Sequence, residues 1–235
     1  MSKVKNGKKL GVLAGMGPAA GAEFLRLLTI KSPASTDQEH PVVYLLSETE
    51  IPDRSPAILG LGADPQQLIY NALQRLSDMG ADILACPCNS AHYFIDRFST
   101  PLTQPLIHIV EETVLAAKAK SPQGAWMIST LGTLQSGLYQ QYADRHNYKL
   151  YLPSSKQAEL IQQCIVQIKA GELAQASKVL TGLVQELWLE RDILVMTACT
   201  ELPLAYSASE LPASKSVSSL EALAAACVRE LFCDS

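Results

Sequence analysis

The sequence is poor in aromatic side chains and in charges, and no run of lysine and arginine is interleaved with aromatics. Phenylalanine, tryptophan and tyrosine make up 6% of the 235 residues, charged residues make up 18%, and the formal net charge is −4. A nucleic-acid-binding surface needs clustered lysine and arginine, commonly with interleaved aromatic side chains. The sequence has no such run, so we expect no nucleic-acid partner. An anionic ligand would need a local group of cations.

Long uninterrupted apolar stretches are missing too. The lysine-rich start followed by LGVLAGM resembles a signal peptide, but Gly15, Gly17 and Pro18 break the apolar run at once. A membrane-spanning helix needs roughly 18 consecutive apolar residues, and no later stretch reaches that length. We therefore expect a cytoplasmic protein without a membrane partner.

The six cysteines show no even spacing that would indicate a disulfide framework, so reduced thiols are expected. Cys86, Cys88 and His92 could begin a metal site, but no second cluster of ligands matches them. The two cysteines could also form a redox pair, although that motif places two residues between its cysteines and this segment has only Pro87. The sequence therefore predicts no metal.

The segment GMGPAA, residues 15–20, matches the glycine fingerprint of dinucleotide-binding folds. Those folds also need an acidic residue at the end of the second strand. Asp37 and Glu39 precede the second predicted strand, and Glu48 lies too far along the chain. We expect no cofactor, and we expect the glycines to expose backbone amides to a carboxylate instead.

Short apolar runs alternate with helical patterns, which is typical of parallel sheets covered by helices. Strands are predicted over 9–15, 41–47, 81–86, 124–130 and 192–196. Helices are predicted over 20–28, 64–80, from about 138, and from about 218 to 233, and residues 51–56 are predicted to form an irregular loop. The predicted fold class is therefore α/β with mainly parallel sheets.

Two segments look alike, namely ADILACPCNSAH at 81–92 and RDILVMTACTEL at 191–202. In this alignment Cys88 matches Cys199, and the glycine turns at Gly17 and Gly132 also correspond. The pattern predicts two related lobes, residues 1–108 with 212–235 and residues 109–211, with the last helix packing back on the first lobe. Chance similarity of two buried strands is the alternative.

The cysteines fall into two groups. Three lie in helical patterns with apolar neighbours, where a cysteine behaves as a small hydrophobic residue: Cys164, Cys227 and Cys233. Cys88 and Cys199 instead follow strand ends, where open α/β sheets place their ligands. If a helix begins near Ala91, its amides can lower a thiol pKa from roughly 8.5 toward neutrality. Two cysteines in matching positions favour a functional pair.

Six motifs in this order, GMGP, TDQEH, IPDRS, PCNSAH, LGTLQSGLY and ACTELP, resemble the aspartate/glutamate racemase family, and specifically its aspartate-racemase branch. The resemblance runs from Gly15 to about Pro203. It implies two pseudo-symmetric lobes with the active site in the cleft between them, and racemisation without pyridoxal phosphate or metal. Some relatives carry threonine at the first cysteine and act preferentially in one direction. With Cys88 and Cys199 both present, we expect two-way racemisation by a homodimer.

Elementary chemistry agrees with a pair of thiols. Inverting an α-carbon requires a proton to leave one face and another to arrive at the opposite face, so two groups of matched pKa are needed. At any moment Cys88 and Cys199 would have to be one thiolate and one thiol, which makes protonation a property of the pair.

The resemblance also implies a set of substrate-binding residues: Met16 through its backbone, Asn89, Ser90, Thr133 and Thr200 at the α-carboxylate and α-amino groups, and Arg54 and Lys169 at the side-chain carboxylate. Ser90 could instead be a turn or cap residue, and Lys169 a solvated helix end. His92 could orient a thiol or simply pack in the core.

Two other readings stay open. Another thiol-dependent enzyme of the same superfamily, such as a maleate isomerase, a hydantoin racemase or an arylmalonate decarboxylase, would use the same fold. A non-catalytic binding protein would keep Arg54 and Lys169 while tolerating loss of either thiol. Aspartate and glutamate are not separated, because one methylene changes binding by only about 1–3 kcal/mol.

Overall fold

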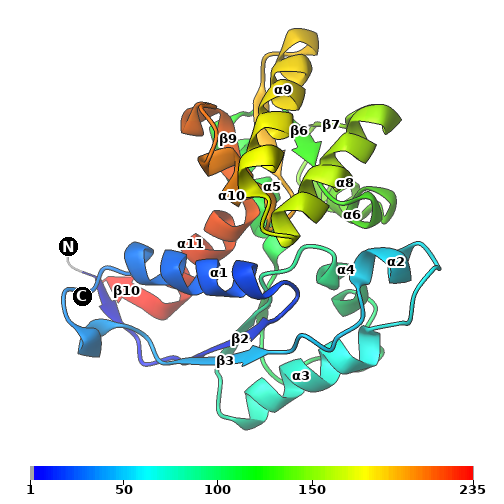
Figure 1. Ribbon diagram of the computed structural model, residues 1–235. Coiled ribbons are helices and arrows are strands. Elements are labelled where there is room, and N and C mark those ends of the chain that lie inside the picture. The colour runs from blue at the N-terminus through cyan, green and yellow to red at the C-terminus, as the bar shows by residue number, and fades with distance from the viewer. Residues whose placement is uncertain (1–2, 235) are drawn as a thin grey trace.

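The computed structural model describes residues 3–234, and these form two α/β lobes stacked one above the other (Figure 1). Each lobe is built on a four-stranded parallel sheet. The first sheet has the order β3-β2-β4-β5, with β2 (Leu10–Ala14), β3 (Val43–Ser47), β4 (Ile83–Ala85) and β5 (Leu106–Ile107). The second has the order β7-β6-β8-β9, with β6 (Ala125–Ile128), β7 (Leu150–Tyr151), β8 (Leu194–Thr197) and β9 (Ser216–Ser218).

The two sheet orders are equivalent, and β4 and β8 hold the same place in them. This confirms the predicted α/β class and the two like-built lobes. The lobe boundaries stay a prediction, and the pairing of β9 with β8 carries the second sheet as far as Ser218. A separate antiparallel pair joins β1 (Lys3–Lys5) to β10 (Phe232–Asp234).

Helices flank both sheets. The first lobe carries α1 (Pro18–Lys31), α2 (Arg54–Ile58), α3 (Gln66–Asp78) and α4 (Ala91–Ile95), with a 3-10 turn over Asp37–Glu39. The rest of the chain forms α5 (Ile109–Lys120), α6 (Leu131–Gln135), α7 (Leu138–Arg145), α8 (Ser155–Lys169), α9 (Leu173–Glu190), α10 (Leu202–Ser207) and α11 (Ser219–Leu231), with a 3-10 turn over Ala213–Lys215. None of the helices within residues 3–234 is long and apolar enough to cross a membrane.

Local sequence explains where these helices begin and end. Pro18 takes the first position of α1, where a missing N–H costs nothing. The buried face of α3 recurs at helical spacing, and Gly80 ends the helix with a φ of 90°, which favours glycine. Ser218 caps α11 by accepting a hydrogen bond from the backbone N–H of Glu221 at 3.2 Å.

One apolar core runs through both lobes. It takes Val12 from the first sheet, Met127 and Met196 from the second, and Leu223 and Cys227 from α11, all of them fully buried. The last helix packs on both α1 and α5 and crosses from one lobe to the other (Figure 1). The lobes are therefore joined by shared packing as well as by the chain.

Two expectations were wrong. Residues 51–56 were predicted to form an irregular loop, but residues 54–56 belong to α2, because Asp53 caps this helix by accepting from the backbone N–H of Ser55 at 3.1 Å. Cys233 was expected in a helix, but α11 ends at Leu231 and Cys233 is exposed in β10. The chain changes from helix to strand there because it pairs with β1.

Candidate active site

Cys88 and Cys199 line the same cavity between the two lobes. Both are buried, and each is only 5% exposed. Fourteen residues line this central cavity: Met16, Asp53, Arg54, Ser55, Cys88, Asn89, Ser90, Thr130, Thr133, Lys169, Ala198, Cys199, Thr200 and Glu201. All nine residues predicted from the sequence are among them, so the structure brings the whole predicted set together.

The central cavity is small, with a volume of about 20 Å³, which is room for about one water molecule. A second cavity of about 400 Å³ adjoins it and shares Asp53, Arg54, Lys169 and Glu201 with it. We call this second space the vestibule. An amino acid is larger than the central cavity, and the vestibule is the larger space next to it.

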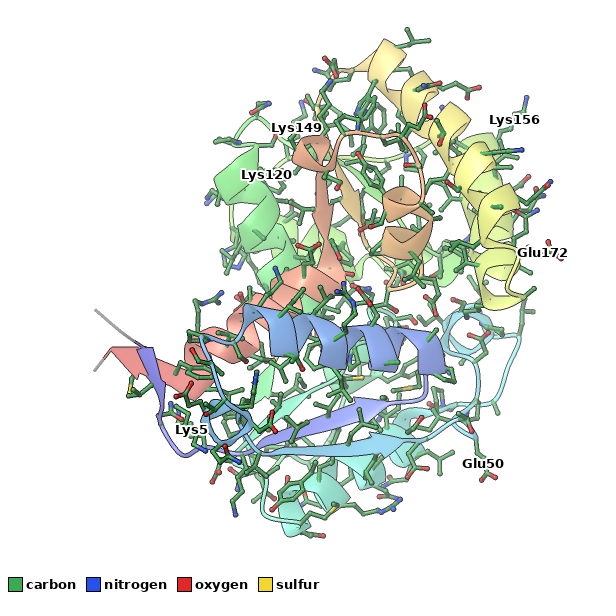
Figure 2. The ribbon with its side chains drawn as sticks, turned by 60° about the vertical axis from the view of Figure 1, so that its left-hand side comes forward. Lys5, Glu50, Lys120, Lys149, Lys156 and Glu172 are labelled. Atoms are coloured by element: carbon green, nitrogen blue, oxygen red, sulfur yellow. The ribbon has the colours of Figure 1, made fainter. Side chains whose placement is uncertain are left out.

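Charged side chains away from the cleft point outward. Figure 2 labels Lys149, Lys156 and Glu172 on the outside of the upper lobe and Lys5 and Glu50 at the edges of the lower one. Four charged residues line the central cavity: Arg54 and Glu201 are buried, whereas Asp53 and Lys169 are exposed.

Cys88 follows the end of β4. The backbone N–H of Cys88 donates to the carbonyl of Cys86 at 2.8 Å, which folds the chain into a tight turn before α4. Its Sγ lies 3.6 Å from Ser90 Oγ. Ser90 is the residue before α4, but its side chain makes no cap hydrogen bond, so its hydroxyl remains at the thiol.

His92 fixes this turn from behind. It is fully buried, its Nδ1 donates to the Cys88 carbonyl at 2.9 Å, and its Nε2 accepts from the backbone N–H of Ile109 at 3.5 Å. Burial, assisted by His108, lowers the pKa of His92 to about 3, so its ring is neutral. Both hydrogen bonds of His92 are to backbone groups, so His92 supports the loop that carries Cys88 and does not contact the thiol through a hydrogen bond.

Asn89 ties the same loop to the rest of the molecule. Its Oδ1 accepts from Tyr139 of α7 at 2.6 Å, and its Nδ2 donates to Ser219 of α11 at 3.0 Å. All three side chains are buried. The amide that was predicted to bind substrate is thus already engaged with protein, and it fixes the position of the Cys88 loop.

Arg54 lies in the cleft from α2 and is only 7% exposed. Its guanidinium donates to the carbonyls of Ile51, Pro52 and Met16 at 2.9–3.1 Å, while Nε is buried without a partner among the described residues. Burial works against its charge, but the neighbouring Cys88 and the Asp53 carboxylate outweigh burial and raise the pKa of Arg54. A fixed positive charge therefore sits beside Cys88.

Cys199 follows the end of β8 and has a different neighbour. Its Sγ donates to Glu201 Oε2 at 3.0 Å, and Thr200 Oγ1 donates to the same oxygen at 3.3 Å. Glu201 is 5% exposed. Burial first, and then the negative charge of Glu201, raise the pKa of Cys199 well above its ordinary value.

The second lobe completes the wall of the central cavity. Thr130 follows β6, caps α6, and donates through Oγ1 to Thr133 Oγ1 at 3.0 Å. Lys169 is the last residue of α8 and is exposed at the rim, where it lines both cavities. Lys169 is thus a helix end, as one reading held, and also a neighbour of the cleft.

The glycine turns allow close approach at the cleft. A side chain at Gly17 would come within 3.1 Å of Glu201 Oε1, and one at Gly132 would come within 2.6 Å of the backbone of Ser55. The second contact lets α6 of one lobe pack directly on α2 of the other. The absence of a side chain at Gly17 and Gly132 therefore allows the two sides of the cleft to pack closely.

Five residues that line the central cavity were not predicted: Asp53, Ser55, Thr130, Ala198 and Glu201. Of these, Glu201 contacts a thiol directly. The signal for Glu201 was present as an acidic residue two positions after Cys199 in ACTE. Within residues 3–234, no group of three or more His, Cys, Asp or Glu side chains is placed to hold a metal ion.

Comparison with known proteins gives consistent results. The family model for Asp/Glu/Hydantoin racemase matches residues 13–228. The broad specificity amino-acid racemase RacX of Bacillus subtilis (strain 168) is 27% identical over 210 residues, which covers 86% of this chain and 90% of that protein. The Picrophilus torridus aspartate racemase structure superposes with a TM-score of 0.82 at 26% identity, covering 95% and 94% of the two chains. The glutamate racemase isoform RacE1 from Bacillus anthracis shares the fold, with a TM-score of 0.68 at 18% identity over 96% and 82%.

Proposed function

The chain belongs to the Asp/Glu/hydantoin racemase family, and from that premise we propose that it interconverts L- and D-aspartate, or L- and D-glutamate, by proton transfer between Cys88 and Cys199 without a cofactor. One observation carries the proposal. The two thiols come from equivalent strand ends of two like-built sheets and line one buried cavity.

The two thiols divide the work of inversion. A thiolate removes the α-proton from one face of the substrate while the thiol of the opposite cysteine delivers a proton to the other face. The thiolate becomes a thiol and the thiol becomes a thiolate, so one turnover exchanges the roles of Cys88 and Cys199. A buried cleft suits this chemistry, because removing water strengthens the electrostatic stabilisation of the intermediate carbanion.

Substrate recognition follows from the remaining walls. Hydroxyls of Ser90 and Thr133 are the donors that would hold the α-carboxylate. The Thr200 hydroxyl lines the same cavity but already donates to Glu201, so we assign it a smaller share. Lys169 at the rim supplies a cation for a side-chain carboxylate, and Arg54 adds positive charge from a fixed position. Because Arg54 already donates to three backbone carbonyls, we assign it a smaller share of direct substrate binding than its place in the family motif implies.

We further propose that the protein acts as a homodimer in the cytoplasm, on a free amino acid. Its similarity to a broad specificity amino-acid racemase makes alanine and other amino acids necessary comparisons for aspartate and glutamate. Sedimentation equilibrium checks the dimer, and a monomer that racemises at full rate would contradict it.

Solvent isotope incorporation tests the proposed function directly. In D₂O, two thiols on opposite faces deliver a proton that has exchanged with solvent. Early D-product from L-aspartate should therefore carry deuterium at the α-carbon while the remaining L-aspartate still carries protium, and the reverse reaction should label L-product likewise. Early product that keeps the original proton would rule out the opposed pair. Release of carbon dioxide from a malonate, or isomerisation of maleate, would point to another activity of the superfamily.

A further inference from the structure

Glu201 is a buried carboxylate that the proton transfer proposed above does not use. It is 5% exposed, and its Oε2 accepts from Cys199 Sγ at 3.0 Å and from Thr200 Oγ1 at 3.3 Å. A carboxylate taken out of water is costly unless its hydrogen bonds are replaced. Both of these hydrogen bonds come from the two residues directly before Glu201, and the shorter of the two is the one from the Cys199 thiol.

Charged and titratable groups face Cys199 from several elements. Glu201 lies on the same strand-end loop, Lys169 approaches from α8, and Tyr139 from α7. Arg54 and Asp53 line the opposite wall of the central cavity at the start of α2. Lys169 opposes Glu201, but it is exposed and therefore screened by solvent. Burial first, and then the Glu201 carboxylate, outweigh Lys169 and raise the pKa of Cys199.

The opposite thiol has the reverse surroundings. Cys88 Sγ lies 3.6 Å from the neutral hydroxyl of Ser90, and the guanidinium held by the carbonyls of Ile51, Pro52 and Met16 stands beside it. Across one cavity, one thiol thus faces a fixed cation and the other donates to a fixed anion.

We infer that Glu201 is a positioning residue that keeps the proton on Cys199 in the free enzyme, so that the resting pair is Cys88 as base and Cys199 as acid. This role deepens the proposed function and rests on it. In the first turnover Cys88 gains the α-proton and Cys199 gives up its own, which leaves a thiolate beside the Glu201 carboxylate. To restore the resting pair, Cys88 releases its proton to solvent and Cys199 takes one up from solvent, or the reverse reaction on the other enantiomer moves both protons back, and no electrons change hands.

The consequence for kinetics is specific. Enantiomers have equal free energy in solution, so kcat/KM must be equal in the two directions. Glu201 instead favours the bound form in which Cys199 is protonated. One enantiomer should therefore show a lower KM and a lower kcat than the other, and Glu201→Gln should bring the two sets of values closer together.

Thiol labelling tests the inference without any substrate. Iodoacetamide reacts with thiolates, and peptide mapping by mass spectrometry follows Cys88 and Cys199 separately in the full chain across a pH series. In Glu201→Gln the amide can still accept from Sγ but carries no charge. We expect its Cys199 to label about tenfold faster at a given pH, a shift of about one pH unit toward acid, with Cys88 unchanged.

The controls separate charge from structure. Glu210→Gln removes the same charge from an exposed residue outside both cavities, and it should leave both profiles unchanged. Glu201→Asp keeps the charge but withdraws it from Sγ, and a smaller shift in the same direction is expected, which keeps the test decisive should the glutamine variant fail to fold. Equal acceleration of Cys88 and Cys199 would show that Glu201 merely keeps the cleft closed, and would overturn the inference.

Failure of the inference and failure of the proposed function give different results. A chain that racemises aspartate but keeps the wild-type Cys199 profile in Glu201→Gln overturns the inference alone. A chain that racemises nothing but shows the shifted profile overturns the proposed function and upholds the assignment of the proton to Cys199.

Discussion

The ends of β4 and β8 occupy the same place in two like-built sheets, and each carries one thiol of the central cavity. Their supports differ. The Cys88 loop is held from outside by a histidine beneath it and by an asparagine bonded to α7 and α11. The Cys199 loop is held from within, by a carboxylate two residues along the chain. Equivalent topology therefore sets where the thiols lie, and unequal neighbours set how each one behaves.

This difference shows what a symmetric reaction requires of a protein. Both enantiomers must be handled, so the geometry around the α-carbon must be matched on its two faces. The charges around the thiols need not match, because a pair that starts as one thiol and one thiolate is unequal already.

Removing either thiol should have the largest effect on the rate of racemisation. Cys88→Ser and Cys199→Ser should each lower racemisation of aspartate by at least about a hundredfold, since a hydroxyl is too weak an acid to replace a thiol. Polarimetry or circular dichroism measures the rate. Cys86→Ser is the matched control, because Cys86 is a buried thiol two residues before Cys88 and lines neither cavity. If the Cys86 variant were inactive and the Cys88 variant active, the pair would be misassigned.

The hydrogen bond from Tyr139 to Asn89, which helps to hold the Cys88 loop, can be removed without changing the cavity lining. Tyr139→Phe leaves Asn89 Oδ1 buried without its donor, and we expect about 1–3 kcal/mol lower stability in urea unfolding. Tyr148→Phe is the matched control, since the Tyr148 hydroxyl is buried and makes no hydrogen bond within the described residues. Equal losses in both variants would mean that the tie between Asn89 and Tyr139 adds nothing.

The hydrogen bond between Cys199 and Glu201 predicts that activity persists at alkaline pH. A proton donor works below its pKa, and the pKa of Cys199 is raised by burial and by Glu201. The rate should therefore persist above the ordinary thiol pKa of about 8.5, and Glu201→Gln should lose about tenfold on the alkaline side. Initial rates across a pH series measure this. A fall of the wild-type rate at the ordinary thiol pKa would contradict it.

The smallest effect is expected at the rim. Lys169→Met should raise KM for aspartate by up to about fivefold, because exposed ion pairs contribute at most about 1 kcal/mol. KM for alanine, which has no side-chain carboxylate, should stay the same. Lys178→Met on the exposed side of α9 is the matched control. Equal changes for both amino acids would remove Lys169 from side-chain recognition.

Much of the fold follows from local pattern. The strands around Cys88 and Cys199 are buried apolar runs, and matching sequence at their ends was enough to predict two lobes and a shared site. Helix α2 was missed because its whole signal is one capping residue, Asp53. Five-residue helices carry no hydrophobic period from which they could be predicted.

The unpredicted parts of the site depend on contacts between distant segments. Asn89 reads as a substrate ligand in its motif, but Tyr139 and Ser219, far along the chain, take both ends of its amide. The engagement of Arg54 with the carbonyl of Met16 is likewise a tertiary contact. Sequence spacing indicates which polar residues lie at strand ends, whereas the direction of each side chain depends on which partners the completed fold brings near.

The apolar core that includes Val12, Met127 and Leu223 belongs to neither lobe alone. The internal likeness of the chain is therefore a likeness of sheets and loops, and not of self-sufficient folding units. Either half, expressed by itself, would expose the surface that α5 and α11 cover in the whole. Opening of the cleft is limited for the same reason, because the lobes can move relative to each other only as far as their shared core allows.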